Sequence, residues 1–147
     1  MSLNMGNGGG EVGYTSGVFD LFHIGHLNLL KNAKSMCDKL VVGVTVDSVA
    51  TYKGKKAIIP FEDRAEIVRS IKWVNAVVPQ YDMNKIEMCK KLKADILFVG
   101  DDWYGTEKWK TIEKELAYVR TSVVYFPYTR GVSSTLITKA LKVGREE

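Results

Sequence analysis

The sequence predicts an α/β fold, a Rossmann-like doubly wound sheet of five parallel strands with helices on both faces. Short apolar runs alternate with helical patterns between residues 12 and 143, and such alternation is typical of right-handed β-α-β crossovers. The run at 40–46 is almost continuously β-branched, as expected for a strand that is covered on both faces. The residues that could carry chemistry follow the strands, where open parallel sheets bind ligands.

Taken in order, the apolar runs predict strands over residues 12–16, 40–46, 76–79, 96–100 and 122–126. Helical spacing predicts helices over 27–36, 47–52, 62–71, 84–92, 106–120 and 133–143. Asp47 and Asn84 are expected to cap the second and fourth of these helices, because their side chains can accept hydrogen bonds from free N–H groups. The third helix is expected to bury one of two sets of apolar residues. One set is Ala65, Val68 and Ile71, and the other is Ile67 and Ile71.

The composition indicates one globular domain. The chain has 147 residues, of which 46% are hydrophobic and 26% charged, and we expect a flexible Gly/Asn-rich tail over 1–11 and a single domain over 12–147. No apolar run reaches membrane-spanning length, and two distant cysteines without a visible signal peptide predict a cytoplasmic protein. The net charge of +4 favours anionic ligands but does not separate nucleotides from nucleic acids.

The stretch 17–26 lies where the first strand ends and a helix is expected to begin. It contains His23 and His26, the two histidines of the sequence, with Gly25 between them. Free backbone N–H groups and the helix dipole make such a position suitable for phosphate, and a glycine allows close approach to the backbone. Imidazoles are further donors that can carry positive charge near neutral pH. A pair of structural histidines, or half of a metal site, is the alternative interpretation.

Three further polar loops are expected at the same edge of the sheet, because each follows a strand. The first is the basic segment with Lys53 and Lys55, whose alternative interpretation is a solvated charged turn. The second contains Asp101, Asp102 and Trp103, which suit recognition of a base, a sugar or an acceptor, or form a polar turn. The third, 128–134, ends at a serine-rich helix start.

These stretches resemble a known group of enzymes. GVFD at 17–20 followed by HIGH at 23–26 resembles the signature of the HxGH nucleotidyltransferases. GDDW at 100–103 and GVSST at 131–135 resemble two motifs of the cytidylyltransferase branch, most closely the glycerol-3-phosphate cytidylyltransferases. The resemblance covers about residues 14–141.

The resemblance implies that the chain is a homodimeric enzyme that uses CTP with Mg²⁺. It would transfer CMP to a small phosphorylated alcohol similar to glycerol 3-phosphate and release pyrophosphate, without binding nucleic acid or membrane and without a metal cage of its own. The implied catalytic residues are His23, His26 and Lys53. The implied nucleotide-binding residues are Gly17, Val18, Phe19, Asp20, His23, Gly25, His26, Lys55, Lys72, Asp101, Asp102, Arg130, Gly131, Val132, Ser133, Ser134 and Thr135. The implied acceptor-binding residues are Lys53, Lys85 and Trp103. Asp20 would brace its loop.

The sequence departs from the family pattern at several positions. Lys72 stands where the closest members have an arginine, which keeps the charge but loses the forked geometry. Tyr128 replaces another arginine, with Arg130 two positions later. Val18 stands where threonine is more frequent. In the segment 80–86 the family tryptophan and lysine are not matched cleanly, so the sequence specifies the acceptor least well.

Three other functions stay open from the sequence. One is an HxGH adenylyltransferase acting on a sugar phosphate or a cofactor precursor. Another is a non-catalytic nucleotide-binding module, and the third is a nucleic-acid-binding protein, motivated by a pI of about 9.0.

Overall fold

The computed structural model describes residues 10–50, 56–82, 84–101 and 104–127. The strands are β1 (Val12–Gly17), β2 (Lys39–Thr45), β3 (Ala76–Gln80), β4 (Ile96–Gly100) and β5 (Ser122–Phe126). The helices are α1 (Ile24–Ser35), α2 (Asp47–Ala50), α3 (Phe61–Arg69), α4 (Lys85–Leu92) and α5 (Glu107–Tyr118). All five strands are parallel and lie in the order β3-β2-β1-β4-β5. The predicted Rossmann-like sheet is confirmed, whereas the helix expected over 133–143 lies outside the described residues.

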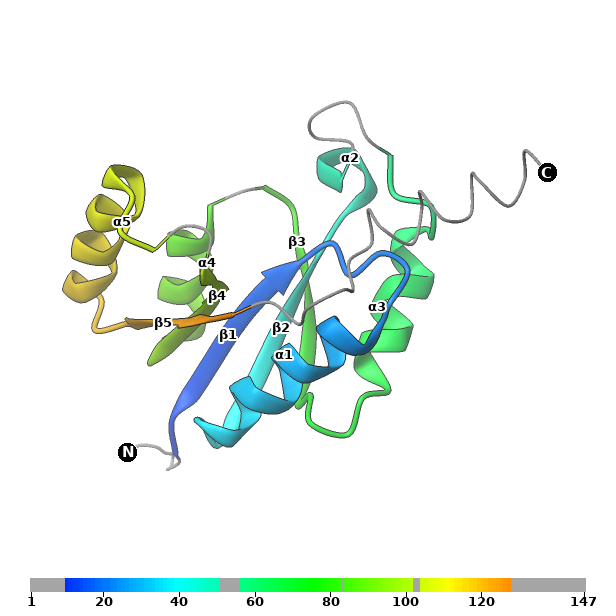
Figure 1. Ribbon diagram of the computed structural model, residues 1–147, viewed down its shortest axis with the longest axis horizontal. Coiled ribbons are helices and arrows are strands. Elements are labelled where there is room, and N and C mark those ends of the chain that lie inside the picture. Colours follow the sequence, from blue (N-terminus) through cyan, green and yellow to red (C-terminus); the bar gives the residue numbers. More distant parts are fainter. Residues whose placement is uncertain (1–9, 51–55, 83, 102–103, 128–147) are drawn as a thin grey trace.

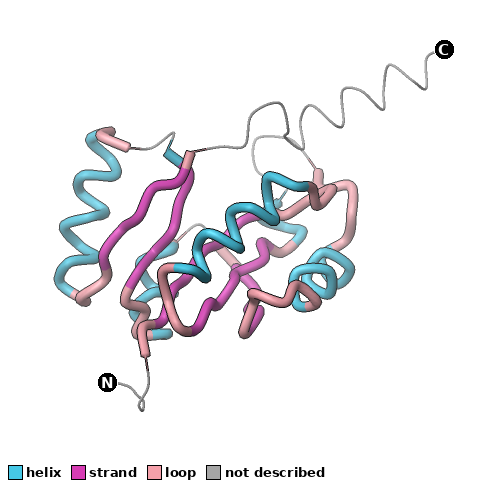
Figure 2. Tube along the Cα trace, turned by 60° about the horizontal axis from the view of Figure 1, so that its bottom comes forward, coloured by secondary structure: helices cyan, strands magenta, loops and turns pink. Residues whose placement is uncertain are grey.

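Helices cover both faces of the sheet (Figures 1 and 2). On one face, Leu30 of α1 and Val68 of α3 pack into a core cluster with Val42 of β2. On the other face, Cys89 of α4 and Leu116 of α5 pack into a second cluster that contains strand residues as well. Neighbouring strand residues point to opposite faces, so one continuous apolar run supplies both cores.

One predicted helix start was wrong, and for α3 the structure confirms the first of the two predicted apolar sets. α1 begins at Ile24 rather than at 27, so His26 lies inside its first turn. In α3, Ala65 and Val68 are buried as expected, but Ile67 is 39% exposed. The largest buried side chain of α3 is instead Arg64, which is 0% exposed. Periodicity of apolar residues could not identify it, because it is charged.

The sheet opens between the central strand β1 and its neighbour β4. The recorded pairing of β1 with β4 is limited to Gly13 with Ile96 and Tyr14 with Leu97, whereas β1 pairs with β2 along its whole length. The hydroxyl of Thr15 donates to the carbonyl of Phe98 over 3.0 Å. This bond satisfies a β4 carbonyl that lies beyond the last residue pair of β1 and β4. The chain order also reverses here, since β2 and β3 lie on one side of β1 and β4 and β5 on the other. Such a point is where α/β sheets hold ligands.

The loops that follow β1, β2, β3 and β4 share the carboxyl edge of the sheet, because the strands are parallel. In Figure 1 the end of β1 and the short helix α2 lie together at the upper end of the sheet. Among the residues that the structure describes, no helix has the length and apolar content needed to cross a membrane.

Candidate active site

The two imidazoles lie against each other at the start of α1. Their ring centroids are 3.9 Å apart with an interplanar angle of 22°. His23 is the N-cap residue, and its Nδ1 accepts a hydrogen bond from the N–H of Gly25 over 3.0 Å. Nδ1 of His26 accepts from the N–H of His23 over 3.2 Å. The pair therefore forms a reciprocal cap, built from imidazoles in place of the usual hydroxyl and carboxylate side chains.

These bonds fix where the ring protons lie. A neutral imidazole has one donor nitrogen and one acceptor nitrogen, and both Nδ1 atoms serve as acceptors. Each ring therefore carries its proton on Nε2. Within the described part of the chain neither Nε2 has a hydrogen-bond partner, so His23 and His26 offer two parallel N–H donors to a ligand.

Burial disfavours the protonated form of both rings. Burial lowers the pKa of His23. Burial, with a smaller contribution from the neighbouring His23, lowers the pKa of His26 to about 4, and Asp20 acts in the opposite direction. Burial therefore favours the neutral rings in the ligand-free protein, whereas bound phosphate would favour the charged rings. Protonation of either Nδ1 would also break a capping bond of α1.

These shifts predict that the protein loses stability in mild acid. Because folding lowers both histidine pKa values below the unfolded value of about 6.5, the neutral rings stabilise the fold fully above that pH and less as the pH falls toward 4. We expect the free energy of unfolding to be roughly 1–2 kcal/mol lower at pH 5 than at pH 7, allowing for partial exposure. Urea unfolding at both pH values measures the difference.

A His26→Gln variant is the matched comparison for this acid effect, since glutamine does not titrate. It should lose less stability than the wild type between pH 7 and pH 5. Asp47 does not interfere, because its pKa is lowered by the hydrogen bond from Arg64 and its contribution is lost only at lower pH. An equal loss in both proteins would show that the histidines are not responsible.

The loop before the histidines is held in an unusual conformation. Phe19 and Leu21 have φ angles of 54° and 50°, in the left-handed region that large side chains rarely adopt. Between them, the carboxylate of Asp20 accepts hydrogen bonds from the N–H groups of Ile58 and Ile59 over 2.9 and 3.0 Å. Asp20 thus braces this loop against the segment that follows the basic stretch, as predicted.

Arg64 ties the same region together from α3. Its Nη1 donates to the carbonyls of Val18 and Thr45, and its Nε donates to that of Ile59, each over 2.7 Å. Its Nη2 forms an ion pair with Asp47 over 2.6 Å. One buried side chain therefore joins the loop after β1, the end of β2, the start of α2 and the segment before α3.

Asp47 does not act as predicted. It is the first residue of α2 rather than its cap. One carboxylate oxygen pairs with Arg64 and the other accepts from the N–H of Phe61, the first residue of α3, over 3.3 Å. The carboxylate therefore caps α3, for which Pro60 offers no side-chain hydrogen bond.

A pocket of about 180 Å³ opens beside this loop, between the ends of β1, β2 and β3. Its lining residues are Ser16, Gly17, Val18, Thr45, Val49, Ala50, Gln80, Asp82 and Lys85. Lys85, at the start of α4, makes no hydrogen bond or ion pair with described residues, and its ammonium lies 5.9 Å from the Trp109 ring centroid. Burial lowers the pKa of Lys85. An ammonium without a counter-charge at a pocket suits an anionic ligand.

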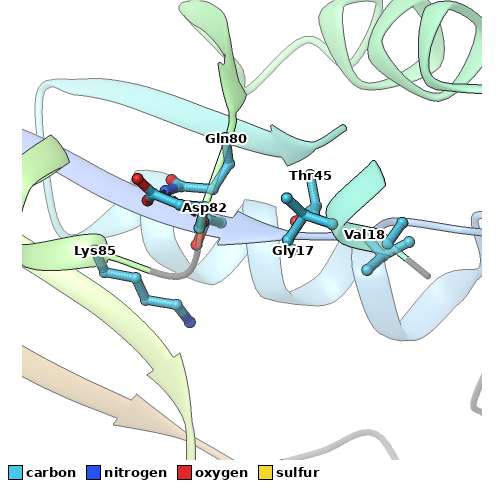
Figure 3. A pocket seen from close by; sticks show the side chains of 9 residues that line it. Gly17, Val18, Thr45, Gln80, Asp82 and Lys85 are labelled. Atoms are coloured by element: carbon cyan, nitrogen blue, oxygen red, sulfur yellow. Dashed lines mark hydrogen bonds between the residues drawn. The ribbon is translucent and has the colours of Figure 1, made fainter. Parts of the chain in front are cut away.

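Figure 3 shows how the polar groups of this pocket are arranged. The ammonium of Lys85 and the carboxylate of Asp82 point in different directions rather than toward each other. Gly17 is the last residue of β1, and Val18 begins the loop that leads to His23. The pocket lining is therefore close in sequence to the imidazole pair.

The structure brings many of the predicted site residues to one edge, but not Lys72. That residue follows α3 and precedes β3, and its ammonium lies 4.8 Å from the centroid of the Trp73 ring. Because β3 begins immediately afterwards, Lys72 is at the amino edge of the sheet, opposite to the histidines. A contact between Lys72 and a nucleotide at the imidazole pair is therefore not supported within one chain.

Several other predicted residues cannot be placed. Asp101 is described and is exposed directly after β4. The predicted residues outside the described ones are Lys53, Lys55, Asp102, Trp103, Arg130, Gly131, Val132, Ser133, Ser134 and Thr135. In the described ranges, no group of three or more His, Cys, Asp and Glu side chains is arranged to hold a metal ion.

Comparisons with known proteins agree with this geometry. Residues 14–140 match the family described as Cytidylyltransferase-like. A glycerol-3-phosphate cytidylyltransferase from Bacillus spizizenii is 38% identical over 126 residues, which cover 85% of this chain and 92% of the relative. An FAD synthase from Pyrococcus abyssi is 35% identical over 130 residues, which cover 86% of each protein.

Among solved structures, the lipopolysaccharide core biosynthesis protein from Thermoplasma volcanium GSS1 has a TM-score of 0.69 at 26% identity, over 82% of this chain and 98% of its own. A pantoate-beta-alanine ligase from Francisella tularensis has a TM-score of 0.60 at 16% identity, over 92% of this chain and 70% of its own. The second similarity concerns the fold alone.

Proposed function

Because this chain belongs to the cytidylyltransferase-like family and is a nucleotidyltransferase, we propose that it transfers the cytidylyl group of CTP to a small phosphorylated alcohol. An oxygen of the acceptor phosphate attacks the α-phosphorus of CTP. The new P–O bond forms as the bond to the bridging oxygen of the β-phosphate breaks, and pyrophosphate leaves with that electron pair. No covalent enzyme intermediate is needed.

The observation that carries this proposal is the pair of free Nε2–H donors of His23 and His26, stacked at 3.9 Å at the start of α1. The reaction gathers negative charge on the phosphate oxygens, and fixed donors aimed at such oxygens lower the barrier. The free N–H groups at the start of α1 add to the same field. Charge on the bound phosphates would favour uptake of protons, but neutral rings already donate.

The basic segment would supply the charge that the imidazoles lack, with Lys53 directed to the acceptor phosphate and Lys55 to the nucleotide. Mg²⁺ would arrive bound to the triphosphate as part of the substrate, since magnesium commonly sits between phosphates rather than in an all-protein cage. The homodimer stays a prediction, and sedimentation of the purified protein tests it.

The pocket beside Val18 favours a small acceptor. Its volume of about 180 Å³ is below the range of roughly 300–1,000 Å³ that is typical of sites for drug-sized ligands. The ammonium of Lys85, which has no partner among the described residues, suits a phosphate group there. A pocket of this size beside an ammonium group supports a small phosphorylated alcohol as the acceptor.

The test is a screen of pyrophosphate release with each of the four nucleoside triphosphates, combined with phosphorylated alcohols and, separately, with FMN. We expect release only with CTP and a small phosphorylated alcohol, and none when the acceptor is omitted. Turnover only with ATP would overturn the cytidylyl assignment. Binding of nucleotide without release in any combination would instead identify a non-catalytic module.

A further inference from the structure

A chain of hydrogen bonds lies under the pocket. The hydroxyl of Tyr14, in the middle of β1, donates to Oε1 of Gln80 at the end of β3. Nε2 of Gln80 then donates to the carbonyl of Asp82 over 2.9 Å and to its Oδ1 over 3.4 Å. Tyr14 is 0% and Gln80 is 3% exposed, so the bond between their side chains is shielded from water.

The direction of this chain is fixed by chemistry. Burial raises the pKa of the Tyr14 hydroxyl well above its usual range, so the phenol keeps its proton and acts as a donor. The carbonyl and the carboxylate of Asp82 can only accept, so the NH₂ group of Gln80 faces Asp82 and its amide oxygen faces Tyr14. Gly43 of β2 leaves room for the contact, since a Cβ there would lie 2.0 Å from the Tyr14 hydroxyl oxygen.

The result is a carboxylate with one oxygen occupied and one open. Oδ1 of Asp82 accepts from Gln80 and, over 2.9 Å, from the N–H of Asn84. Oδ2 makes no hydrogen bond to any residue that the structure describes. Asp82 is one of the two charged residues that line the pocket, and the ammonium of the other, Lys85, points in a different direction (Figure 3). The pocket thus offers an anion-binding group and, apart from it, a strong hydrogen-bond acceptor.

We propose that Asp82 determines acceptor specificity by accepting a hydrogen bond from a free hydroxyl of a small polyol monophosphate, and that Gln80 is the positioning residue for this carboxylate. The proposal rests on the proposed function and specifies its substrate class. The Asp82 charge repels the phosphate end of the acceptor, which leaves that end for Lys85. A quaternary ammonium acceptor is less suitable, because such groups are bound by aromatic cages and no aromatic side chain lines the pocket in the described structure.

The experiment removes the donor and the acceptor of the proposed hydrogen bond, separately and together. Propyl phosphate lacks the free hydroxyls of glycerol phosphate, so it removes the donor. Asp82→Ala lacks the carboxylate, so it removes the acceptor. With CTP saturating, we expect wild-type kcat/KM to be about 10- to 100-fold higher for glycerol phosphate, as for a hydrogen bond to a charged group. In Asp82→Ala this preference should nearly vanish, with KM for CTP unchanged. Glu87→Ala, a neighbouring exposed acid outside the pocket, is the matched control and should keep the preference.

Tyr14→Phe and Gln80→Leu test the positioning role. Each should raise KM for glycerol phosphate several-fold and leave KM for CTP unchanged, whereas general damage to the site would change both constants.

The outcomes separate this inference from the proposed function. If the wild type releases no pyrophosphate with CTP and any acceptor, the proposed function fails. If the wild type is active but Asp82→Ala keeps the full preference for glycerol phosphate, the inference fails alone. A wild-type preference for ethanolamine phosphate over glycerol phosphate would also overturn it, since the carboxylate would then select an ammonium group.

Discussion

His26→Ala is expected to reduce pyrophosphate release by a factor on the order of 10²–10³, the usual effect of losing one fixed donor to a developing negative charge. The side chain contributes one of two free Nε2–H groups, and its ring packs edge-on to Phe19 with centroids 5.3 Å apart. The measurement is the rate of pyrophosphate release with CTP and the best acceptor of the screen. KM for CTP should change less than kcat if the donor acts mainly in the transition state.

The fold must survive this change for the rate to be informative. The variant loses the ring contacts of His26 with Phe19 and Phe22. It also loses the bond between Nδ1 of His26 and the N–H of His23, and we expect this lost cap to cost about 1 kcal/mol. Lys31→Ala is the control on the same helix, because Lys31 is exposed and lies 5.7 Å from the Trp73 ring centroid. It should leave the rate unchanged. Full activity of a folded His26→Ala protein would remove the histidine from the mechanism.

Arg64→Ala is expected to lower the free energy of unfolding by about 3–5 kcal/mol. The substitution empties a fully buried position and leaves the carbonyls of Val18 and Thr45 without their donor. It also removes the partner of Asp47. Arg64→Lys should recover only part of the loss, because one ammonium cannot reproduce the forked guanidinium bonds. Urea unfolding at pH 7 measures the change.

The control for this prediction is a second arginine of α3. Arg69 forms an ion pair with Glu66 over 2.5 Å, but both side chains are more than half exposed. Arg69→Ala should therefore change stability by less than about 1 kcal/mol. Equal effects at the two positions would show that the buried bonds of Arg64 contribute little.

The fold could be predicted from the sequence because its strands are short apolar runs with clear ends. The strands over 96–100 and 122–126 were predicted to the residue. The start of α1 was missed by three positions, since the helix is capped by His23 and histidine is not among the usual N-cap residues. The capping residue Asn84 belongs to that set, and its side chain does accept from the N–H of Glu87 over 3.0 Å.

The site was less predictable than the fold, for a physical reason. The histidines and Asp20 are close in sequence, so a local pattern indicates them. The contacts of Arg64 join segments up to 46 positions apart, and no spacing rule encodes such a junction. The neutral state of the rings also depends on burial, which is a property of the folded chain. Lys72 resembled a functional position, yet its place after α3 puts it at the other edge of the sheet.

The left-handed residues beside Asp20 have a consequence for protein engineering. Conformations of this kind cost about 1–3 kcal/mol for each residue, and Phe19 and Leu21 keep them while Ile58 and Ile59 hold Asp20 from outside the loop. A synthetic peptide of this stretch, or the same stretch grafted onto a foreign sheet, would relax and separate the two rings. Transplanting the activity therefore requires moving the third helix and the segment before it together with the histidines.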